Sequence, residues 1–247
     1  MELQEILYCQ GFGTRRVCAG LVQQGWVTVY ENGSTTGEKC LDAFQEFKTE
    51  GLELDVQGKR WPFHAKAYIM LNKPMNVECS QKPSVYPSIY SLLPPPLRQR
   101  PQKGAVDGVQ AVGRLDQDTT GLLLLSDDGK FIHKMSSPKT HLPKVYHATV
   151  KHPLDQKQID KLLSGVVLDD DPKPVKASSC QILGPNLLEL VLTEGKYHQV
   201  KRMVAAVSNR VEGLHRAKIG GLELPADLAP GQWRWLSPAD LNHLMQK

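Results

Sequence analysis

The chain has 247 residues, 40% of them hydrophobic and 23% charged, which is enough to bury one large domain or two unequal domains. Apolar runs such as Leu122–Leu125 fall far short of the roughly 20 residues that cross a bilayer, so we expect a cytoplasmic protein without a membrane segment. Five widely spaced cysteines and eight histidines without metal-ligand spacing predict neither a disulfide framework nor a metal site.

The first 60 residues predict a small α/β module of two helices and paired strands. Each helix is closed by a glycine, and Thr14 has the position of the N-cap of the second helix. Alternating apolar residues predict the strands. The helices are expected at 3–11 and 14–25, and the strands at 26–33 and 52–56.

A polar, proline-containing segment follows this module, and the charge balance changes sign there. Residues 1–60 carry six Lys and Arg against nine Asp and Glu, whereas residues 61–247 carry 24 against 17. We therefore place a linker at 61–66, between the module and a larger domain of residues 67–247.

The larger domain opens with a predicted strand at 67–74 and continues into a proline-rich stretch at 81–104. Six prolines within this stretch exclude a continuous helix or a central strand. We expect a long loop, of the kind that is often functional inside a compact domain.

Strands and helices then follow one another without regular βαβ alternation. This order predicts an α+β domain with a mixed, largely antiparallel sheet. The strands are expected at 122–126, 144–150, 187–193 and 210–220, and the helices at 130–136, 154–163, 197–207 and from Ser237 onward.

The stretch "GRLDQDTTGLLLLSDDG" places Asp116 on a loop directly before a buried strand, which is a common position for reactive groups. Arg114 alternates with Asp116, so the two side chains project the same way. A purely structural ion pair would explain this spacing equally well. Asp116 and Asp118 are poor candidates for a glycosidase pair, because neighbours two residues apart do not lie on opposite sides of a sugar.

Positive charge is densest between Lys196 and Lys218, where six Lys and Arg accompany a single acid, Glu212. Such a surplus attracts a partner rich in phosphate, although a solvated helix face has the same composition.

Three blocks, "GRLDQDTTGLLLLSDDG", "KVYHATV" and "LTEGKYHQVKRM", resemble in order and separation those of the Rsu/Rlu branch of the ribosomal RNA pseudouridine synthases. The similarity continues through "VEGLHRAKIGGLEL" and "LAPGQWRWL" and covers residues 67–240. The form "YHQVKRM" is most similar to members that act on small-subunit, 16S ribosomal RNA. The resemblance implies an isomerase that converts uridine to pseudouridine after flipping the base out of the RNA.

The resemblance also implies roles for individual residues. Asp116 matches the catalytic aspartate, and Tyr146 matches an active-site tyrosine that stacks on the flipped base. Lys201 matches a cation paired with the aspartate. The residues implied in substrate and RNA binding are Arg114, which replaces the extruded nucleotide, Leu192, which packs under the base, and His198 and Arg202.

The N-terminal module is similar to the small RNA-binding domain named after ribosomal protein S four. Arg15 and Arg16 begin a helix at the position where that domain contacts phosphates, and a helix N-terminus favours the same anion.

We therefore expect a monomeric enzyme without cofactor or metal, whose partner is 16S ribosomal RNA or a small-subunit assembly intermediate. Two alternatives stay open. One is a synthase for large-subunit, 23S ribosomal RNA, and the other is a non-catalytic RNA-binding or ribosome-assembly protein of the same fold.

Overall fold

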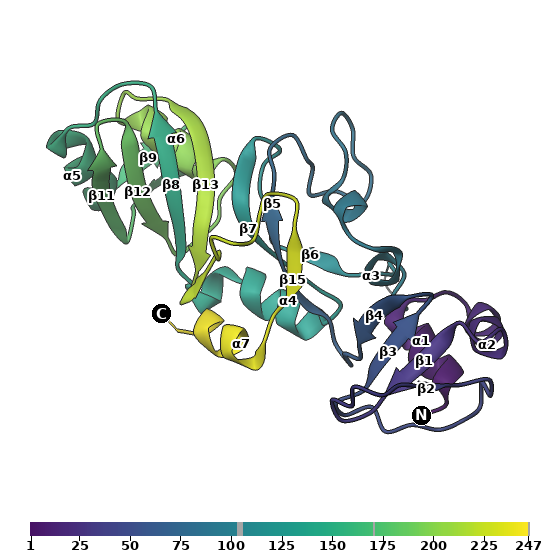
Figure 1. The fold of residues 1–247 in the computed structure, drawn as a ribbon. Helices are drawn as coiled ribbons and strands as arrows, with labels where there is room; N and C mark the ends of the chain where they lie inside the picture. The colour runs from purple at the N-terminus through teal and green to yellow at the C-terminus, as the bar shows by residue number, and fades with distance from the viewer. Residues whose placement is uncertain (103–105, 170, 247) are drawn as a thin grey trace. The chain divides into compact units, whose positions relative to one another are not determined.

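The computed structural model describes residues 1–102, 106–169 and 171–246 (Figure 1). The chain forms two compact units, each made of segments that are separate in the sequence. Unit 1 comprises Met1–Ala67, Leu93–Gln110 and Ser126–Asp128, and unit 2 comprises Tyr68–Leu92, Ala111–Leu125 and Gly129–Lys247.

Unit 1 packs two helices against a four-stranded antiparallel sheet of order β2-β1-β3-β4. Thr14 caps the second helix as expected, accepting a hydrogen bond from the Val17 amide at 3.3 Å. The first helix ends at Gly11, where φ is +89° and a Cβ would overlap the Pro96 carbonyl oxygen. The elements are α1 (Leu3–Gln10), α2 (Arg15–Gln23), β1 (Val27–Tyr30), β2 (Glu38–Lys39), β3 (Glu53–Val56) and β4 (Lys59–Pro62).

Strand β4 occupies the start of the segment predicted as a linker. Its Trp61 pairs with Leu54 of β3 and is 7% exposed. The indole also meets the Phe12 ring edge-on, with the centroids 5.5 Å apart. Because this apolar side chain is buried in the sheet, the linker predicted at 61–66 begins inside a strand. The division of the chain into two consecutive domains stays a prediction.

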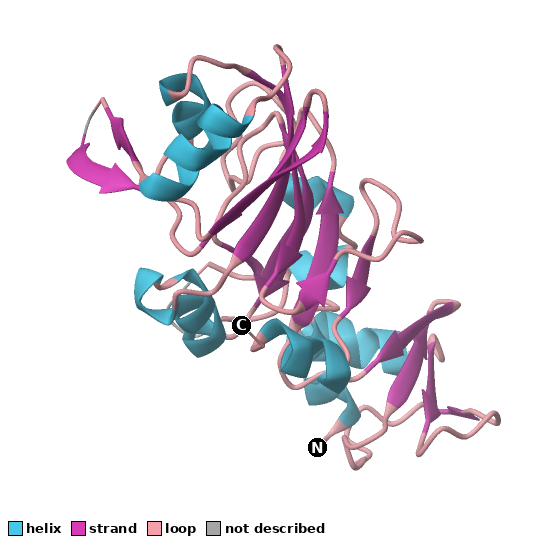
Figure 2. Ribbon diagram, turned by 90° about the vertical axis from the view of Figure 1, so that its left-hand side faces the viewer, coloured by secondary structure: helices cyan, strands magenta, loops and turns pink. Residues whose placement is uncertain are grey.

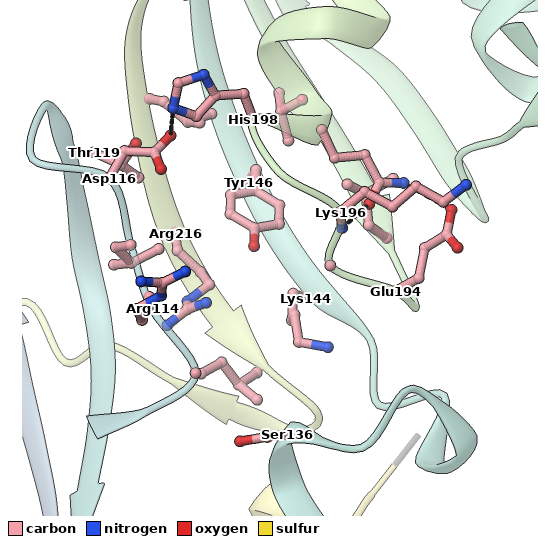
Figure 3. Close-up of a pocket in the computed structure, with 18 of the residues that line it drawn as sticks. Arg114, Asp116, Thr119, Ser136, Lys144, Tyr146, Glu194, Lys196, His198 and Arg216 are labelled. Carbon is pink, nitrogen blue, oxygen red and sulfur yellow. Dashed lines mark hydrogen bonds and ion pairs between the residues drawn. The ribbon is translucent and has the colours of Figure 1, made fainter. Parts of the chain in front are cut away.

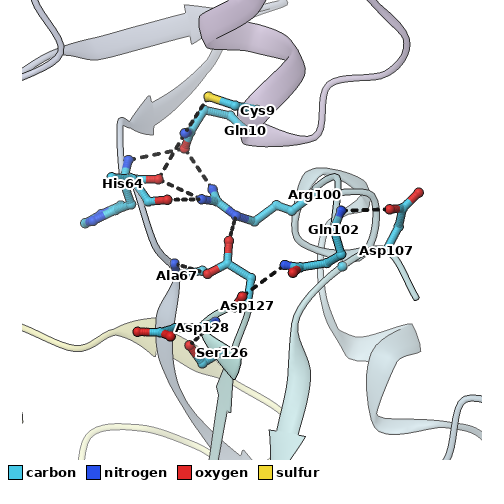
Figure 4. A network of polar contacts seen from close by, with 12 residues as sticks. Cys9, Gln10, His64, Ala67, Arg100, Gln102, Asp107, Ser126, Asp127 and Asp128 are labelled. Carbon is cyan, nitrogen blue, oxygen red and sulfur yellow. Dashed lines mark hydrogen bonds and ion pairs between the residues drawn. The ribbon is translucent and has the colours of Figure 1, made fainter. Parts of the chain in front are cut away.

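A buried ion pair joins three distant stretches of unit 1 (Figure 4). Arg100 Nε donates to Asp127 Oδ2 at 2.7 Å, and the two side chains are 2% and 5% exposed. The same guanidinium donates to Gln10 Oε1 at 3.0 Å and to the His64 carbonyl at 2.7 Å. Asp127 Oδ1 accepts from the Ala67 amide at 2.7 Å. The N-terminal segment of unit 1, Met1–Ala67, therefore depends on side chains that come much later in the sequence.

Within the described residues, unit 2 is built on a nine-stranded mixed sheet (Figure 2). Strand β8 runs antiparallel to β12 and β13, whereas β13 runs parallel to β7. These pairings confirm the predicted α+β fold with a mixed, largely antiparallel sheet. The strands are β5 (Tyr68–Lys73), β6 (Gln110–Val112), β7 (Thr119–Ser126), β8 (Lys144–Val150), β11 (Ser179–Gly184), β12 (Leu187–Leu192), β13 (Val211–Ile219), β14 (Leu222–Glu223) and β15 (Trp233–Trp235).

Helices α5 and α6 lie against one face of this sheet (Figure 2). The apolar run of β7 is fully buried, as expected of a central strand. None of the helices in the described ranges has the length and apolar character of a membrane span. The remaining elements are α4 (Gly129–Ser136), η2 (Pro138–Thr140), α5 (Gln156–Ser164), β9 (Val166–Leu168), β10 (Asp171–Val175), α6 (Gln199–Ala206) and α7 (Pro238–Leu244).

The proline-rich stretch contains two short helical turns, η1 (Ile89–Leu92) and α3 (Pro95–Arg98), where a single long loop was expected. Proline is tolerated in the first turn of a helix, which explains the difference. Just before this stretch, the Glu78 carboxylate accepts hydrogen bonds from the backbone amides of 84–86, which lower the pKa of Glu78 to about 2. Residues 103 and 104 of the predicted loop lie outside the described residues.

Replacing Arg100 by Met is expected to lower the free energy of unfolding by about 3–5 kcal/mol, because Asp127 is then a buried carboxylate without its cation. Arg98→Met is the matched control, since Arg98 is exposed on α3. It should change the free energy by less than about 0.5 kcal/mol. Urea denaturation followed by circular dichroism measures both variants. Equal stabilities would show that the buried pair does not hold unit 1 together.

Candidate active site

A cavity of about 260 Å³ opens in unit 2 beside the loop that leads into β7 (Figure 3). Its walls come from this loop, from β7, β8 and β13, from the end of β12 and from the start of α6. The predicted site residues that line it are Arg114, Asp116, Tyr146, Leu192, His198 and Lys201.

The loop that carries Asp116 is fixed at both ends but leaves the carboxylate accessible. It turns at Gly113, where φ is +72°, and Leu115 is buried. The Asp116 carbonyl accepts from the Thr119 amide at 3.1 Å, at the start of β7. The side chain of Asp116 is 32% exposed. A rigid backbone thus presents a carboxylate to the cavity.

Lys73, at the end of β5, binds this loop through hydrogen bonds from its ammonium group. Its side chain is buried, and Nζ donates to the carbonyl oxygens of Pro74 at 3.0 Å, Gln117 at 3.3 Å and Thr119 at 2.8 Å. Burial lowers the pKa of Lys73. The sequence analysis missed this residue, because a lysine at a strand end carries no signal that it is buried.

Lys201 of α6 lies between two carboxylates. Its Nζ donates to Asp116 Oδ2 at 3.0 Å, as expected, and also to Asp118 Oδ1 at 2.7 Å, which the sequence analysis did not predict. Burial lowers the pKa of Lys201, but the hydrogen bonds to both carboxylates outweigh it and raise the pKa above its ordinary value. Burial likewise raises the pKa of Asp118, and Lys201 outweighs it and lowers that pKa. Lys201 therefore stays charged and keeps Asp118 ionised.

His198 lies on the other side of the Asp116 carboxylate. Its Nε2 is 3.5 Å from Asp116 Oδ2, a contact drawn in Figure 3. The residue precedes α6 in the left-handed conformation, with φ of +46°. Its imidazole stacks on the Tyr197 ring at 3.8 Å between centroids, and Tyr197 is 73% exposed. The imidazole that contacts Asp116 is therefore stacked on an exposed aromatic ring.

The sheet register places Tyr146 in the middle of the cavity (Figure 3). Tyr146 of β8 pairs with Arg216 of β13, which in turn pairs with Gly121 of β7. A Cβ at Gly121 would overlap the Arg216 carbonyl oxygen, so glycine permits the close approach of these strands. Leu192, at the end of β12, is buried and lines the same cavity.

The predicted arginines are divided between the cavity and other surfaces. Arg114 is exposed and lines the cavity. Arg202 does not line it, and Nη1 of Arg202 donates to the Tyr197 carbonyl at 3.2 Å. Arg15 and Arg16 belong to α2 of unit 1, where the Arg15 guanidinium pairs with the Glu5 carboxylate. The RNA-binding roles of Arg15, Arg16 and Arg202 stay predictions.

The lining also includes three cations that were not predicted as site residues, Lys144 of β8, Lys196 and Arg216. Across the described residues, no three His, Cys, Asp or Glu side chains are grouped as a metal site. The arrangement presents the Asp116 carboxylate, hydrogen-bonded to the Lys201 ammonium, to a ligand that can stack on Tyr146. Such a group can act as a nucleophile or as a base.

Comparisons with known proteins identify the family of the chain. A family model described as RNA pseudouridylate synthase matches residues 67–206. The protein named ribosomal small subunit pseudouridine synthase A is 37% identical in Pasteurella multocida, over 92% of both chains. Its Yersinia pestis counterpart is 40% identical, over 98% of this chain and 97% of that protein. A crystal structure of a pseudouridylate synthase matches 99% of both chains with 33% identity and a TM-score of 0.67.

Replacing Lys201 by Met is expected to raise the pKa of Asp118, because burial then acts without the opposing cation. Lys201→Arg keeps the charge and should keep this pKa low. Carboxyl ¹³C shifts followed by NMR against pH measure the titration. Lys157→Met, at an exposed position of α5, is the matched control. A titration curve of Asp118 that is the same in Lys201→Met and in the control would contradict the proposed coupling.

Proposed function

The chain belongs to the RNA pseudouridylate synthase family, and on this premise we propose that its cavity isomerises a uridine of small-subunit, 16S ribosomal RNA to pseudouridine. The observation that carries the site assignment is the Asp116 carboxylate, which faces the cavity with Lys201 at 3.0 Å and shares the lining with Tyr146. The names of the curated relatives support the choice of small-subunit RNA.

Pseudouridine formation breaks the bond between N1 of uracil and C1′ of ribose, and rejoins the two through C5. The proton on C5 must leave, and a proton is returned to N1, so atoms and electrons balance without an oxidant. The reaction needs a carboxylate near the sugar and a pocket that holds the detached base. Asp116 fits this need in three ways: by bonding to the sugar, by bonding to the base, or by removing a sugar proton.

The groups around Asp116 orient its carboxylate and provide a surface for the base. Lys201 keeps the carboxylate oriented through a hydrogen bond at 3.0 Å, and His198 lies 3.5 Å from the same oxygen. Tyr146 is 9% exposed, so its ring offers a dry surface on which a uracil can stack, and its hydroxyl can assist removal of the C5 proton. Leu192 supplies an apolar contact beneath the base.

The target uridine has to leave the RNA stack before it reaches the cavity. Arg114 is exposed beside the cavity, which is a suitable place for a side chain that fills the vacated position in the RNA. Arg202 and the α2 arginines, Arg15 and Arg16, would add contacts to phosphates. The carboxylate of Glu5 already pairs with Arg15, so Arg15 must leave this carboxylate before it can bind a phosphate.

A monomeric state of the enzyme stays a prediction. Ribosomal RNA is modified where ribosomes assemble, so a cytoplasmic location follows from the substrate, whether this is 16S RNA or an assembly intermediate. A glycosidase arrangement is disfavoured, since Asp116 and Asp118 both bind one ammonium group and do not oppose each other across a sugar.

Replacing Asp116 by Asn is expected to abolish isomerisation, by at least about a thousandfold, because the amide is neither a nucleophile nor a base. Asp160→Asn is the matched control at an exposed position of α5. Both variants should keep the unfolding temperature of the wild type. Single-turnover assays on 16S transcripts and on small-subunit particles measure the effect. Turnover of Asp116→Asn within tenfold of the control would refute the assignment.

The substrate is tested by mapping pseudouridines in ribosomal RNA from cells with and without this protein. We expect one 16S position to lose its modification and to regain it when the wild-type chain is restored. Loss at a 23S position instead would establish the large-subunit alternative. Unchanged 16S and 23S maps, together with RNA binding by the purified chain, would favour a non-catalytic role.

A further inference from the structure

Two cations, Arg216 and Lys144, line the floor of the cavity. Arg216 is 4% exposed, and its Nε is fixed by the Leu122 carbonyl at 2.8 Å. Its Nη2 is buried without a hydrogen-bond partner. Lys144 Nζ donates to the Leu142 carbonyl at 3.1 Å. In the described part of the chain, neither cation forms an ion pair with a carboxylate.

The sheet register sets both cations beside Tyr146. Arg216 lies directly opposite Tyr146 on β13, and Lys144 lies two residues before Tyr146 on β8. Side chains two residues apart on a strand, and side chains opposite each other across strands, share one face of a sheet. All three line the cavity, and Figure 3 shows them around the same space.

Leaving these charges unpaired is costly. A buried charge is normally paired, because desolvation costs several kcal/mol for each ion. Burial, together with the charge of Arg216, lowers the pKa of Lys144. Of the carboxylates that line the cavity, Asp116 is engaged by Lys201, and Glu194 accepts a hydrogen bond from Gln199 Nε2 at 2.8 Å. The floor of the cavity therefore lacks a negative charge that a ligand could supply.

The proposed reaction generates such a charge. When the bond between N1 and C1′ breaks, its electron pair leaves with the base, and uracil becomes an anion with charge spread over N1, O2 and O4. We propose that Arg216, assisted by Lys144, is a catalytic residue that binds the carbonyl oxygens of this detached uracil anion. The proposal rests on the function proposed above.

The symmetry of uracil suits a fixed pair of donors. A half-turn of the detached base about the line through N3 and C6 exchanges N1 with C5, and it also exchanges O2 with O4. A donor that holds O2 before this rotation therefore holds O4 afterwards. C5 then bonds to C1′, which neutralises the base, and the proton on C5 is afterwards lost while N1 gains one. Arg216 would thus stabilise the base only while it is free.

A backbone phosphate is the other anion that could meet these cations, but the observations favour the base. Arg216 is 4% exposed on the sheet floor next to Tyr146, whereas the phosphates stay on the RNA chain outside the cavity. The exposed Arg114 is better placed for a phosphate. The two anions predict different kinetics, because a phosphate contact acts on binding and a contact with the leaving base acts on the chemical step.

The test compares the full-length wild-type protein with Arg216→Gln, Arg216→Lys and Lys144→Met, and uses Arg210→Gln as the matched control. Arg210 is exposed on the surface, where it pairs with Glu212. Each protein is given the same RNA with either uridine or 5-fluorouridine at the target position. Fluorine withdraws electrons and stabilises the departing anion by itself. Single-turnover loss of the normally bonded nucleoside is followed at saturating enzyme, and RNA affinity is measured at matched salt.

We expect Arg216→Gln to slow uridine cleavage by about 100-fold or more, the size of effect seen when one donor to a developing oxyanion is removed. The loss for 5-fluorouridine should be smaller by roughly tenfold, and RNA affinity should stay within about threefold of the wild type. The cleavage rate of Arg216→Lys should lie between those of the wild type and Arg216→Gln. Lys144→Met should show the same dependence on 5-fluorouridine, with a smaller loss of rate. Arg210→Gln should match the wild type.

Equal losses with uridine and 5-fluorouridine in both Arg216→Gln and Lys144→Met would overturn the proposal, because a merely structural role does not depend on the leaving base. Weakened RNA affinity with an unchanged chemical step would also overturn it and place a phosphate at Arg216. If Arg216→Gln fails to fold, Arg216→Lys and Lys144→Met decide the outcome, again by comparing the loss of rate with uridine and with 5-fluorouridine. A wild-type protein that leaves uridine unchanged would refute the proposed function itself, which separates that failure from this one.

Discussion

The contact of Lys201 with two carboxylates is the interaction on which the proposed chemistry depends. Burial alone would raise the pKa of Asp118, and the ammonium of Lys201 outweighs this effect and lowers it. The same ammonium lies 3.0 Å from Asp116 Oδ2 and 2.7 Å from Asp118 Oδ1. Lys201 donates to both carboxylates, so Asp116 does not have this ammonium to itself. The cavity thus receives a carboxylate that is held in place by a cation which it shares with Asp118.

The sheet of unit 2 positions the Asp116 loop beside the other residues of the cavity. The parallel pairing of β7 with β13, and the antiparallel pairing of β13 with β8, set the Asp116 loop close to Tyr146. Lys73 ties the same loop to β5 through the carbonyl groups of Gln117 and Thr119. Backbone hydrogen bonds and one buried lysine therefore fix the relative positions of groups that lie up to 85 residues apart in the sequence. This rigidity is what a site needs to orient a reactive base.

The sequence predicts the long elements and the reacting groups, and the structure adds the buried cations. Apolar runs such as Leu122–Leu125 and helical spacing in α5 give strong local signals, so these elements are found where expected. Short strands such as β14 and β15 form only through their partners, and no local pattern marks them. Lys73 and Arg216 could not be recognised, because a charged residue is normally solvated and their partners are distant carbonyl groups.

The Arg100–Asp127 pair also sets an order of events during synthesis. Gln10 and the His64 carbonyl are made early, but the guanidinium that binds them and the aspartate that binds this guanidinium are made later. Asp127 lies beyond the midpoint of the 247-residue chain. The N-terminal helices and sheet therefore emerge from the ribosome well before their last stabilising contacts exist, and this part of the chain completes its folding only after half of the protein has been translated.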